Sequence, residues 1–444
     1  MQRVQARPTV VHQAPPVPPG PITAERYVSP AWAAREATNL WPRAWLFAGL
    51  EGDVAEPGQY VTFDIGRESV IVARADDGTL AASYNSCQHR GMRLTNGQGC
   101  AKSIVCGYHG WTYRPDGRLV VVPDNDRFAG GVDRARHSLQ RVRVEAWGGL
   151  VFVCMDPDAA PLRSWLGGVA ERVEPYRLED MVLVGDQTVR LECNWKAVFD
   201  NFGELYHVEH IHPQHALLFD CPTALVELFA NGHTGVVIDG HTVNTRLPVP
   251  EEPNFFMRHQ MKVLGIDPAA YNGRILDFRR DVQKVRREVA PGLGFDYDRL
   301  SDERLSDIEQ YNLFPNTMIT VQPDSALLMR ARPHPTDPNV CFWDKLTFRM
   351  APDASVAERA GLPYEPHPST LFEQPSRPEH DEFDQEDIIA GRKTMTITID
   401  QDVHYIRDVQ RGMHSRGFRA ARLCDDEVRV QHYHDWLDAV MGVR

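Results

Sequence analysis

Four residues in two short segments have the types and spacing to hold an iron–sulfur cluster. Cys87 and His89 form a C-x-H pair, and Cys106 and His109 form a C-x-x-H pair, with sixteen residues between the pairs. Two thiolates suit one iron of a [2Fe–2S] cluster and two imidazoles suit the other. Histidine ligation raises the reduction potential above that of an all-cysteine cluster. The pattern therefore predicts a redox centre of the Rieske type.

A structural zinc ion is the alternative for this ligand set, because two cysteines and two histidines also form tetrahedral zinc sites. Zinc fingers usually pair cysteine with cysteine and histidine with histidine, whereas each segment here mixes the two. Glycine and aromatic residues also surround the second pair, in Gly107–Trp111. Both features favour the iron–sulfur cluster over zinc.

Length and composition exclude several classes of protein. The chain of 444 residues is long enough for two or three domains. Its net charge of −13 argues against a nucleic-acid partner. No run approaches the roughly 18 apolar residues of a membrane span, and Met1–Pro19 lacks the apolar core of a signal sequence. The eight cysteines show no disulfide framework, so we expect a cytoplasmic location.

Local patterns predict two regions of different structure. From residue 45 to 156 the sequence reads as short strands, with hairpin signals at Asp77-Gly78 and Asp116-Gly117, and both Cys/His pairs fall on loops. After Pro157, strand-like runs such as 181–184 and 340–343 alternate with longer helical stretches, which predicts an α+β region. Two further expectations are a helix over about 25–40 and a long solvated excursion over 363–387, which is rich in proline and acids.

A second group of metal-ligand types lies downstream, at His207, His210, His212 and His215. An α-helix rotates about 100° per residue, so His207 and His210 share a face, whereas His207 and His212 do not. Pro213 implies that a helix has ended or become distorted by His212. The spacing alone therefore leaves both pairings open.

These residues occur together in one known arrangement. The chain resembles the oxygenase (α) subunit of the Rieske non-haem iron ring-hydroxylating oxygenases, over nearly its whole length and with the two metal motifs in the same order. The residues that carry the resemblance are the two Cys/His pairs, Asn194-Trp195-Lys196, Asp200-Asn201, Glu204, and Tyr206-His207 followed by His212.

The resemblance implies a mononuclear Fe(II) held by His207, His212 and a downstream aspartate. The family often has Gln-Arg-Gly eight residues after that aspartate, and this spacing from Gln410 indicates Asp402. Such a ligand set leaves adjacent positions on the iron open for O2 and substrate. The competing donors nearby are Asp400, Asp408 and His404.

Three further residues receive roles from the resemblance. An acid three residues before the first iron histidine, here Glu204, joins that histidine to a cluster histidine of a neighbouring subunit. Asn201 and Tyr206 are implied to support the iron ligands. Gln401 departs from the acid usual before the aspartate, and His432 and His434, near aromatic residues, are interpreted as structural.

The resemblance also implies the fold and the domain organisation. We expect an α+β protein, with an all-β Rieske [2Fe–2S] domain at 42–156. A catalytic domain at 157–444 should follow, with a central antiparallel sheet of the helix-grip, START-like kind. Residues 1–41 should form an N-terminal arm and a helix that pack on the catalytic domain.

The implied activity is that of a terminal oxygenase component that uses O2. Electrons from NAD(P)H should arrive through a separate reductase, directly or by way of a ferredoxin, because no nucleotide-binding fingerprint is visible. The implied assembly is a homotrimer, with a β subunit left open. No nucleic acid or membrane is expected as a partner.

Two rival interpretations of the cluster motif are less consistent with the sequence. A respiratory Rieske protein has an extra cysteine pair, but Met92 and Tyr108 occupy those positions, and Trp111 replaces the hydroxyl donor that follows its second histidine. Fewer hydrogen bonds to sulfur predict a potential near the low end of the Rieske range, roughly −150 mV. A ferredoxin fused to a binding domain would not explain the second metal motif.

The substrate stays open between two classes, as does the choice between mono- and dioxygenation. An aromatic or hydrophobic small molecule leads by family frequency. A quaternary amine, attacked by N-demethylation or C–N cleavage, is the alternative, because members acting on such amines often carry Glu at the position of Glu204. The expected pocket segment is 217–326, with these candidate lining residues: Phe219, Phe229, Phe255, Phe256, Met257, Tyr311, Leu313 and Phe314.

Overall fold

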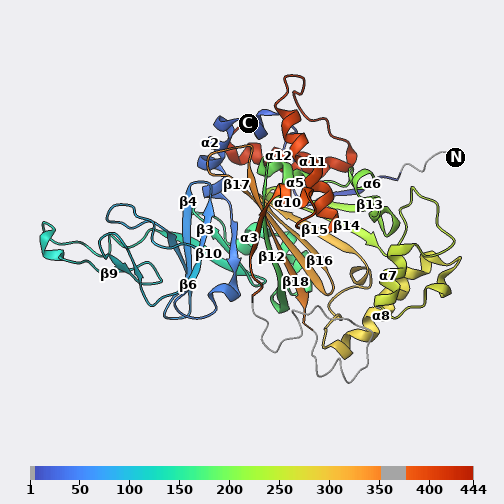
Figure 1. Ribbon diagram of the computed structural model, residues 1–444, viewed down its shortest axis with the longest axis horizontal. Helices are drawn as coiled ribbons and strands as arrows, with labels where there is room; N and C mark the ends of the chain where they lie inside the picture. Colours follow the sequence, from blue (N-terminus) through green and yellow to red (C-terminus); the bar gives the residue numbers. More distant parts are fainter. Residues whose placement is uncertain (1–5, 352–376, 444) are drawn as a thin grey trace. The chain divides into compact units, whose positions relative to one another are not determined.

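The computed structural model describes residues 6–351 and 377–443 of the chain (Figure 1). The chain divides into two compact units, one formed by residues 33–165 and the other by the residues before 33 and after 165. Each unit is built around its own sheet. The boundaries expected after residues 41 and 156 stay predictions.

The unit of residues 33–165 is built from antiparallel strands. A seven-stranded sheet has the order β2-β11-β10-β5-β4-β3-β6, and a three-stranded sheet has the order β7-β8-β9. Gly78 and Gly117, with φ of +82° and +87°, close the hairpins β4–β5 and β8–β9, as the Asp-Gly signals predict. The strands are β2 (Leu46–Leu50), β3 (Gln59–Ile65), β4 (Glu68–Arg74), β5 (Leu80–Tyr84), β6 (Gln98–Cys100), β7 (Ile104–Val105), β8 (Thr112–Tyr113), β9 (Leu119–Val121), β10 (Arg141–Trp147) and β11 (Leu150–Cys154).

The other unit contains a nine-stranded sheet of order β1-β13-β14-β15-β16-β17-β18-β12-β19. Neighbouring strands from β13 to β12 pair antiparallel, whereas the edge strands β1 and β19 pair parallel to β13 and β12. The expected α+β fold with a large antiparallel sheet is therefore confirmed. The strands are β1 (Thr9–His12), β12 (Met181–Leu191), β13 (Phe219–Leu228), β14 (Thr234–Gly240), β15 (Ile308–Leu313), β16 (Thr317–Gln322), β17 (Ser325–Pro333), β18 (Cys341–Met350) and β19 (Asp381–Asp384).

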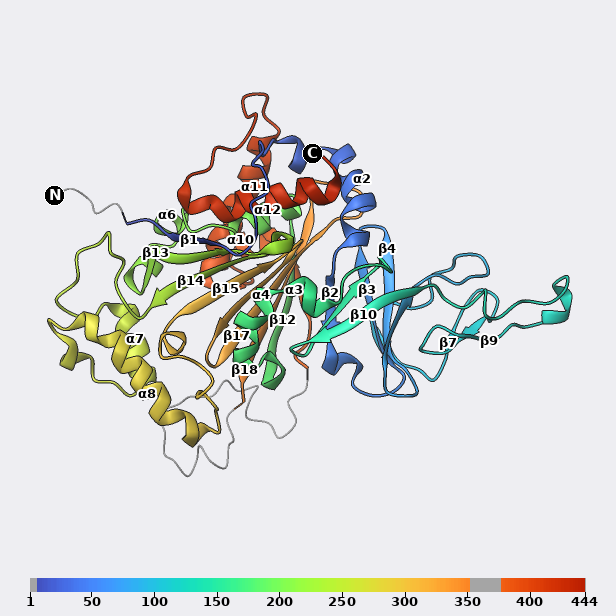
Figure 2. The same ribbon diagram turned by 180° about the vertical axis from the view of Figure 1, so that it is seen from behind.

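Helices α5, α10, α11 and α12 gather against this sheet (Figures 1 and 2). Helix α5 packs on β17 and β18 and against α11, and α12 packs on β13 and β14. No helix in the described ranges combines the length and apolar character that a membrane crossing needs. The helices are α1 (Glu25–Val28), α2 (Pro30–Asn39), α3 (Leu162–Leu166), α4 (Gly168–Val173), α5 (Trp195–Asn201), α6 (Val208–Ile211), α7 (Phe255–Val263), α8 (Phe278–Leu293), α10 (Gln385–Ile389), α11 (Ile397–Met413) and α12 (Val428–Met441).

Two local expectations need correction. The helix expected over 25–40 is broken into α1 and α2 at Pro30, which lacks the backbone N–H that a continuous helix requires. Residues 381–384, expected to lie in a solvated excursion, form β19 beside β12, and residue 385 starts α10 after the N-cap Asp384. Residues 363–376 of that expected excursion lie outside the described residues.

Candidate metal centres

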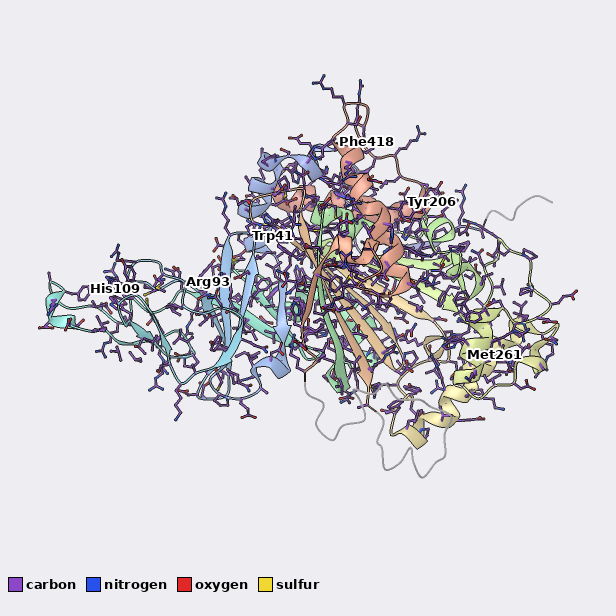
Figure 3. All side chains as sticks on the ribbon, viewed as in Figure 1. Trp41, Arg93, His109, Tyr206, Met261 and Phe418 are labelled. Carbon is purple, nitrogen blue, oxygen red and sulfur yellow. The ribbon has the colours of Figure 1, made fainter. Side chains whose placement is uncertain are left out.

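The two Cys/His pairs lie on loops with the same backbone geometry. The Cys87 N–H donates to Met92 O at 2.9 Å, and Cys87 O accepts from Gly91 N at 2.8 Å. In the second loop the Cys106 N–H donates to Trp111 O at 2.8 Å, and Cys106 O accepts from Gly110 N at 2.9 Å. Each loop therefore folds back on its cysteine, and His109 is exposed whereas His89 is partly buried. Figure 3 labels His109 on the second loop.

The four side chains converge and fit the predicted cluster. Cys87 and Cys106 are buried, and the imidazole centroids of His89 and His109 lie 4.5 Å apart. Nδ1 of His89 is buried without a hydrogen-bond partner in the described protein, which leaves its lone pair for a metal. Burial raises the pKa of Cys87 and lowers that of His89, which favours the thiol and the neutral imidazole in the metal-free protein.

Tyr113 is a neighbour of the cluster residues that the sequence analysis missed. Its hydroxyl lies 3.4 Å from Sγ of Cys87 and accepts a hydrogen bond from Gln88 N at 3.0 Å. Trp111 occupies the position at which a hydroxyl donor was expected, but the hydroxyl comes from two residues later, on β8. A hydrogen bond to a cluster thiolate raises the reduction potential, so the low-end potential expected above omits this contribution.

A break in the helix brings His207 and His212 together. Helix α6 covers only Val208–Ile211, and His212 has left it, with φ −119° and ψ 60°. The two imidazole centroids are 5.2 Å apart. On a continuous helix, side chains five residues apart would point about 140° away from each other. The helix end before Pro213, rather than helical periodicity, therefore decides which histidines pair. His210 is exposed and lies outside the site.

Both imidazoles present Nε2 to one carboxylate oxygen. Oδ1 of Asp402, on α11, lies 3.0 Å from Nε2 of His212 and 3.6 Å from Nε2 of His207. The three ligand atoms lie within 4.8 Å of one another. Nδ1 of His207 is hydrogen-bonded to Glu204, and Nδ1 of His212 lies 2.8 Å from Oε1 of Gln401. Oxygen partners on Nδ1 favour the tautomer that carries its proton there, in which Nε2 can bind a metal.

The competing donors near Asp402 are occupied elsewhere. Asp400 accepts from Thr394 and from the Met395 N–H, and so closes the turn before α11. The side chain of Asp408 is 74% exposed and pairs with Arg411. His404 is exposed, and its Nδ1 lies 2.6 Å from a backbone carbonyl. Of these acids and imidazoles, the structure brings only Asp402 to the two histidines.

Glu204 and Asn201 lie at the site, whereas Tyr206 does not enter it. Glu204 Oε2 accepts from the N–H groups of Tyr206 and His207, while Oε1 holds the His207 ring. Burial would lower the pKa of His207, but the hydrogen bond and charge of Glu204, together with the charge of Asp402, outweigh this effect and raise it. Asn201 lines the cavity, and its Nδ2 is buried without a partner in the described protein. The Tyr206 ring, labelled in Figure 3, is 53% exposed.

The metal-ligand residues open onto a cavity of about 270 Å³. Its helical side comes from α5, α6 and α11, and its sheet side from β13 to β17. Of the candidates expected from the sequence, Phe219 lines it, whereas Phe255 is 76% exposed and Tyr311 is buried against Glu309. Burial lowers the pKa of His215, a lining residue bonded to Thr398, to about 4. The apolar lining residues are Phe202, Leu205, Val208, Phe219, Cys221, Ile238, Ile308, Leu327, Met329 and Ile399.

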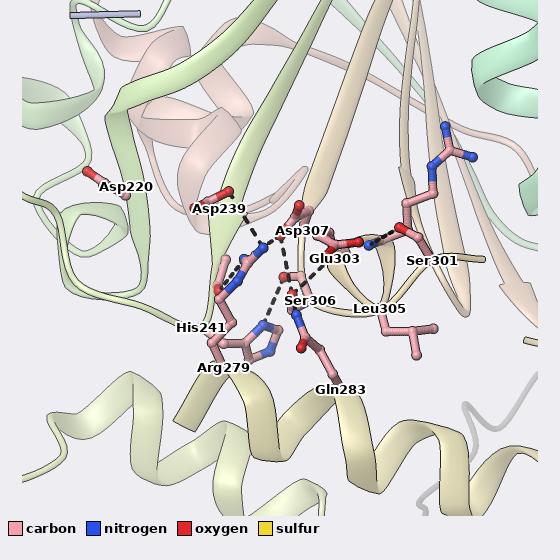
Figure 4. Close-up of polar contacts among 12 residues, drawn as sticks. Asp220, Asp239, His241, Arg279, Gln283, Ser301, Glu303, Leu305, Ser306 and Asp307 are labelled. Carbon is pink, nitrogen blue, oxygen red and sulfur yellow. Dashed lines mark hydrogen bonds and ion pairs between the residues drawn. The ribbon is translucent and has the colours of Figure 1, made fainter. Parts of the chain in front are cut away.

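A polar network fixes the strand ends that carry part of this lining (Figure 4). Arg279 of α8 pairs with Asp307, lies 3.6 Å from Asp239 and donates to Gly240 O at 3.1 Å. His241, in the left-handed conformation with φ +57°, donates from Nδ1 to Ser306 O at 3.0 Å. These bonds tie α8 to the ends of β14 and β15, next to the lining residues of both strands.

Two family profiles match the chain. The profile of the Rieske [2Fe-2S] domain matches residues 44–142. The profile described as "Ring hydroxylating alpha subunit (catalytic domain)" matches residues 178–443, which is more than half of the chain.

Curated relatives align with about two fifths of this chain and with two fifths to one half of their own length. The glycine betaine monooxygenase oxygenase subunit of Chromohalobacter salexigens is 33% identical over 189 residues, 42% of each chain. The large oxygenase component of the naphthalene 1,2-dioxygenase system of Pseudomonas putida is 38% identical over 184 residues, 40% of this chain and 41% of that one. A solved quaternary ammonium Rieske monooxygenase with L-carnitine covers 95% of both chains, with a TM-score of 0.64 and 20% identity, which shows a shared fold.

We predict that His207→Ala and Asp402→Asn each remove the mononuclear metal and leave the cluster intact. Each change deletes one of three protein ligands, so iron content should fall by about one atom per chain, with the cluster absorbance unchanged. Elemental analysis and visible spectroscopy measure both quantities. His210→Ala and Asp408→Asn are the matched controls and should keep full iron content. Unchanged iron in His207→Ala would contradict this site.

We predict that Tyr113→Phe lowers the reduction potential of the cluster. In the unaltered protein the hydrogen bond stabilises the more negative, reduced cluster by about 1 kcal/mol. Its loss corresponds to a decrease of roughly 40 mV for one electron. Potentiometric titration followed by circular dichroism measures the shift. Tyr84→Phe, at the end of β5, serves as the control. An unchanged potential in Tyr113→Phe would show that the hydroxyl does not act on the sulfur.

Proposed function

The chain belongs to the family of ring-hydroxylating α subunits, and we propose that it is the terminal oxygenase component of a Rieske-type multicomponent oxygenase. Such a component uses O2 and reductase-supplied electrons to hydroxylate a small molecule, with one oxygen atom or two. The observation that carries this proposal is the apolar cavity that reaches His207, His212 and Asp402, in a chain with a separate Cys/His cluster motif.

The donor sets assign the two cofactors. Two thiols and two imidazoles on matched loops would hold a [2Fe–2S] Rieske cluster, whose ligands are Cys87, His89, Cys106 and His109. His207, His212 and Asp402 would hold one Fe(II). When bound, the cluster supplies electrons one at a time, and the iron provides adjacent coordination positions at which O2 is activated.

The surrounding residues set the state of these ligands. Glu204 fixes the His207 ring, and in the assembly we propose it also couples that ring to a cluster histidine of a neighbouring subunit. Gln401 fixes the His212 ring in the same way. Asn201 presents a buried amide beside the iron ligands. Tyr206, exposed next to Glu204, would support the site from the subunit boundary.

The electron donor is proposed to be an NAD(P)H-dependent reductase, acting directly or through a ferredoxin. Residues 87–141 contain nine Lys and Arg against four Asp, although the whole chain has a net charge of −13. Arg118, Arg134 and Arg141 line a hollow of about 540 Å³ there. Leu119 and Leu139 of the hollow pack in the same core as the cluster cysteines. This charge suits an acidic electron carrier.

The proposed assembly is a homotrimer, and the proposed location is the cytoplasm. A homotrimer follows from the family resemblance, because Glu204 needs a cluster histidine from another subunit, and a β subunit is compatible with it. All eight cysteines are free thiols, which supports a reducing cytoplasm.

The cavity favours an aromatic or hydrophobic substrate over a charged one. A cavity of about 150 Å³ holds benzene in another protein, so the 270 Å³ here suits one or two rings. Among the described residues that line it, none is Lys or Arg, and only Phe202 and Phe219 are phenyl rings. A carboxylate would therefore lack a cationic partner, and a quaternary ammonium would lack the aromatic cage that usually binds it.

A quaternary amine is the second candidate, and two observations favour it. Glu204 adds a carboxylate to the lining, and one of the curated relatives described above oxidises glycine betaine. A cation could pair with Glu204 only in competition with His207, which already occupies that carboxylate. For this reason we place the aromatic substrate first.

A single-turnover experiment separates the two candidates. Chemically reduced protein is exposed to isotopically labelled O2 with a pool of arenes and aromatic acids, or with a pool of betaines, carnitine and choline analogues. We predict labelled hydroxylated arenes, with one added oxygen for a monooxygenase or two for a dioxygenase. His207→Ala should form no product. Demethylated amine or aldehyde would establish the second candidate, and no labelled product from either pool would contradict an oxygenase.

A further inference from the structure

Two polar side chains on the sheet side of the cavity have unused hydrogen-bonding capacity. Gln310 on β15 and Thr320 on β16 are directly opposite in the antiparallel register, so their side chains share one face of the sheet. Both line the cavity and are partly accessible. The Gln310 amide NH2 and the Thr320 hydroxyl have no partner among the described residues, although apolar side chains surround them.

A buried arginine fixes the orientation of the Gln310 amide. Both terminal nitrogens of Arg429, on α12, donate to Oε1 of Gln310, at 3.2 and 3.3 Å, and its Nε donates to Thr234 at 3.1 Å. Arg429 is 1% exposed. A guanidinium has donors only, so the amide atom that faces it must be the carbonyl oxygen. The NH2 group is therefore turned away from α12.

The charge on Arg429 strengthens this amide as a donor. A carbonyl that accepts hydrogen bonds from a cation is polarised, and polarisation makes the attached NH2 a better donor. Both groups that reach the cavity are nevertheless neutral. A buried carboxylate needs a charged partner, whereas a ketone, nitro or ether oxygen needs only donors of this kind. The pair therefore suits a neutral acceptor oxygen.

We propose that Gln310, oriented by Arg429, forms with Thr320 a subsite that binds a neutral hydrogen-bond-accepting oxygen on the substrate ring. This proposal rests on the proposed oxygenase function, and it names the substrate class as arenes with a carbonyl, nitro or ether substituent. The oxygen on the sheet side would orient the ring, because the metal-ligand residues lie on the opposite, helical side, at the two ends of α6 and on α11. Gln310 is thus a specificity-determining residue.

Binding of a matched pair of ligands tests the subsite without turnover. Acetophenone carries the acceptor oxygen, isopropylbenzene replaces that oxygen with a methyl group, and benzoate carries a charged acceptor. Dissociation constants come from the change in intrinsic fluorescence of the full-length, metal-loaded protein without reductant. We expect acetophenone to bind about five- to tenfold more tightly than isopropylbenzene, as one or two neutral hydrogen bonds would give. Benzoate should bind more weakly than acetophenone.

Three variants assign this preference to Gln310. Gln310→Leu removes the donors at similar size, and Gln310→Glu removes them while keeping an acceptor for Arg429. Both should bring the ketone-to-hydrocarbon ratio close to one, with isopropylbenzene binding changed by less than about twofold. Gln322→Leu is the matched control, because Gln322 lies on β16 outside the cavity lining, and it should keep the full preference.

Several outcomes overturn the subsite. Equal binding of the ketone and the hydrocarbon by the unaltered protein, no binding of either, tighter binding of benzoate, or an unchanged preference in both Gln310 variants each contradict it. A preference for acetophenone that the unaltered protein shows and the Gln310 variants lose supports the subsite, even if single turnover yields no oxygenated arene. In that case the proposed function fails and the subsite does not.

Discussion

The catalytic unit depends on one geometrical constraint, which is that two imidazoles five residues apart must face the same carboxylate. A continuous helix would turn them about 140° apart, so α6 ends at Ile211 and His212 leaves it with a non-helical backbone, φ −119° and ψ 60°. Oxygen atoms of Glu204 and Gln401 then hold each ring by Nδ1. The result is a preorganised site in which ring rotation is restricted before any metal binds.

The helical side and the sheet side of the cavity have different roles. The candidate metal ligands are the two histidines that flank α6 and Asp402 of α11, and hydrogen bonds from Glu204 and Gln401 fix the histidine rings. The strands β13 to β17 contribute six of the ten apolar lining residues, and in β13, β15 and β17 the lining residues alternate along the strand, as residues on one face of a sheet do. The network around Arg279 fixes one end of this sheet surface. A rigid sheet beneath the ligands can thus determine how a substrate lies while the ligand geometry stays the same.

Much of this arrangement could be predicted from the sequence, because metal-ligand types and glycine turns carry local signals. The paired loops of the cluster and the hairpins at Gly78 and Gly117 are of this kind. Contacts between distant segments could not be predicted. Gln401 was read as a departure from the family, yet it orients His212, and Tyr113 reaches Cys87 from β8. Edge strand β19 lies in a charged stretch that resembles loop sequence.

The residues that line the cavity were harder still to predict from the sequence. Apolar and aromatic content indicated eight candidate lining residues, and of these only Phe219 lines the cavity, because strand register decides which residues face it. Gln310 gave no signal in the sequence, since its neighbour Arg429 lies 119 residues away. Register and such distant pairings are properties of the folded sheet, so the clustering of His207, His212 and Asp402 was easier to predict than the cavity lining.

The most direct test of the account is the metal and sulfide content of the purified protein. Two centres in one chain predict about three irons and about two acid-labile sulfides per chain, with a rhombic electron paramagnetic resonance signal after reduction. Zinc in place of iron, or equal amounts of iron and sulfide, would contradict the account. The first result would make the Cys/His pairs a structural zinc site, and the second would remove the mononuclear centre.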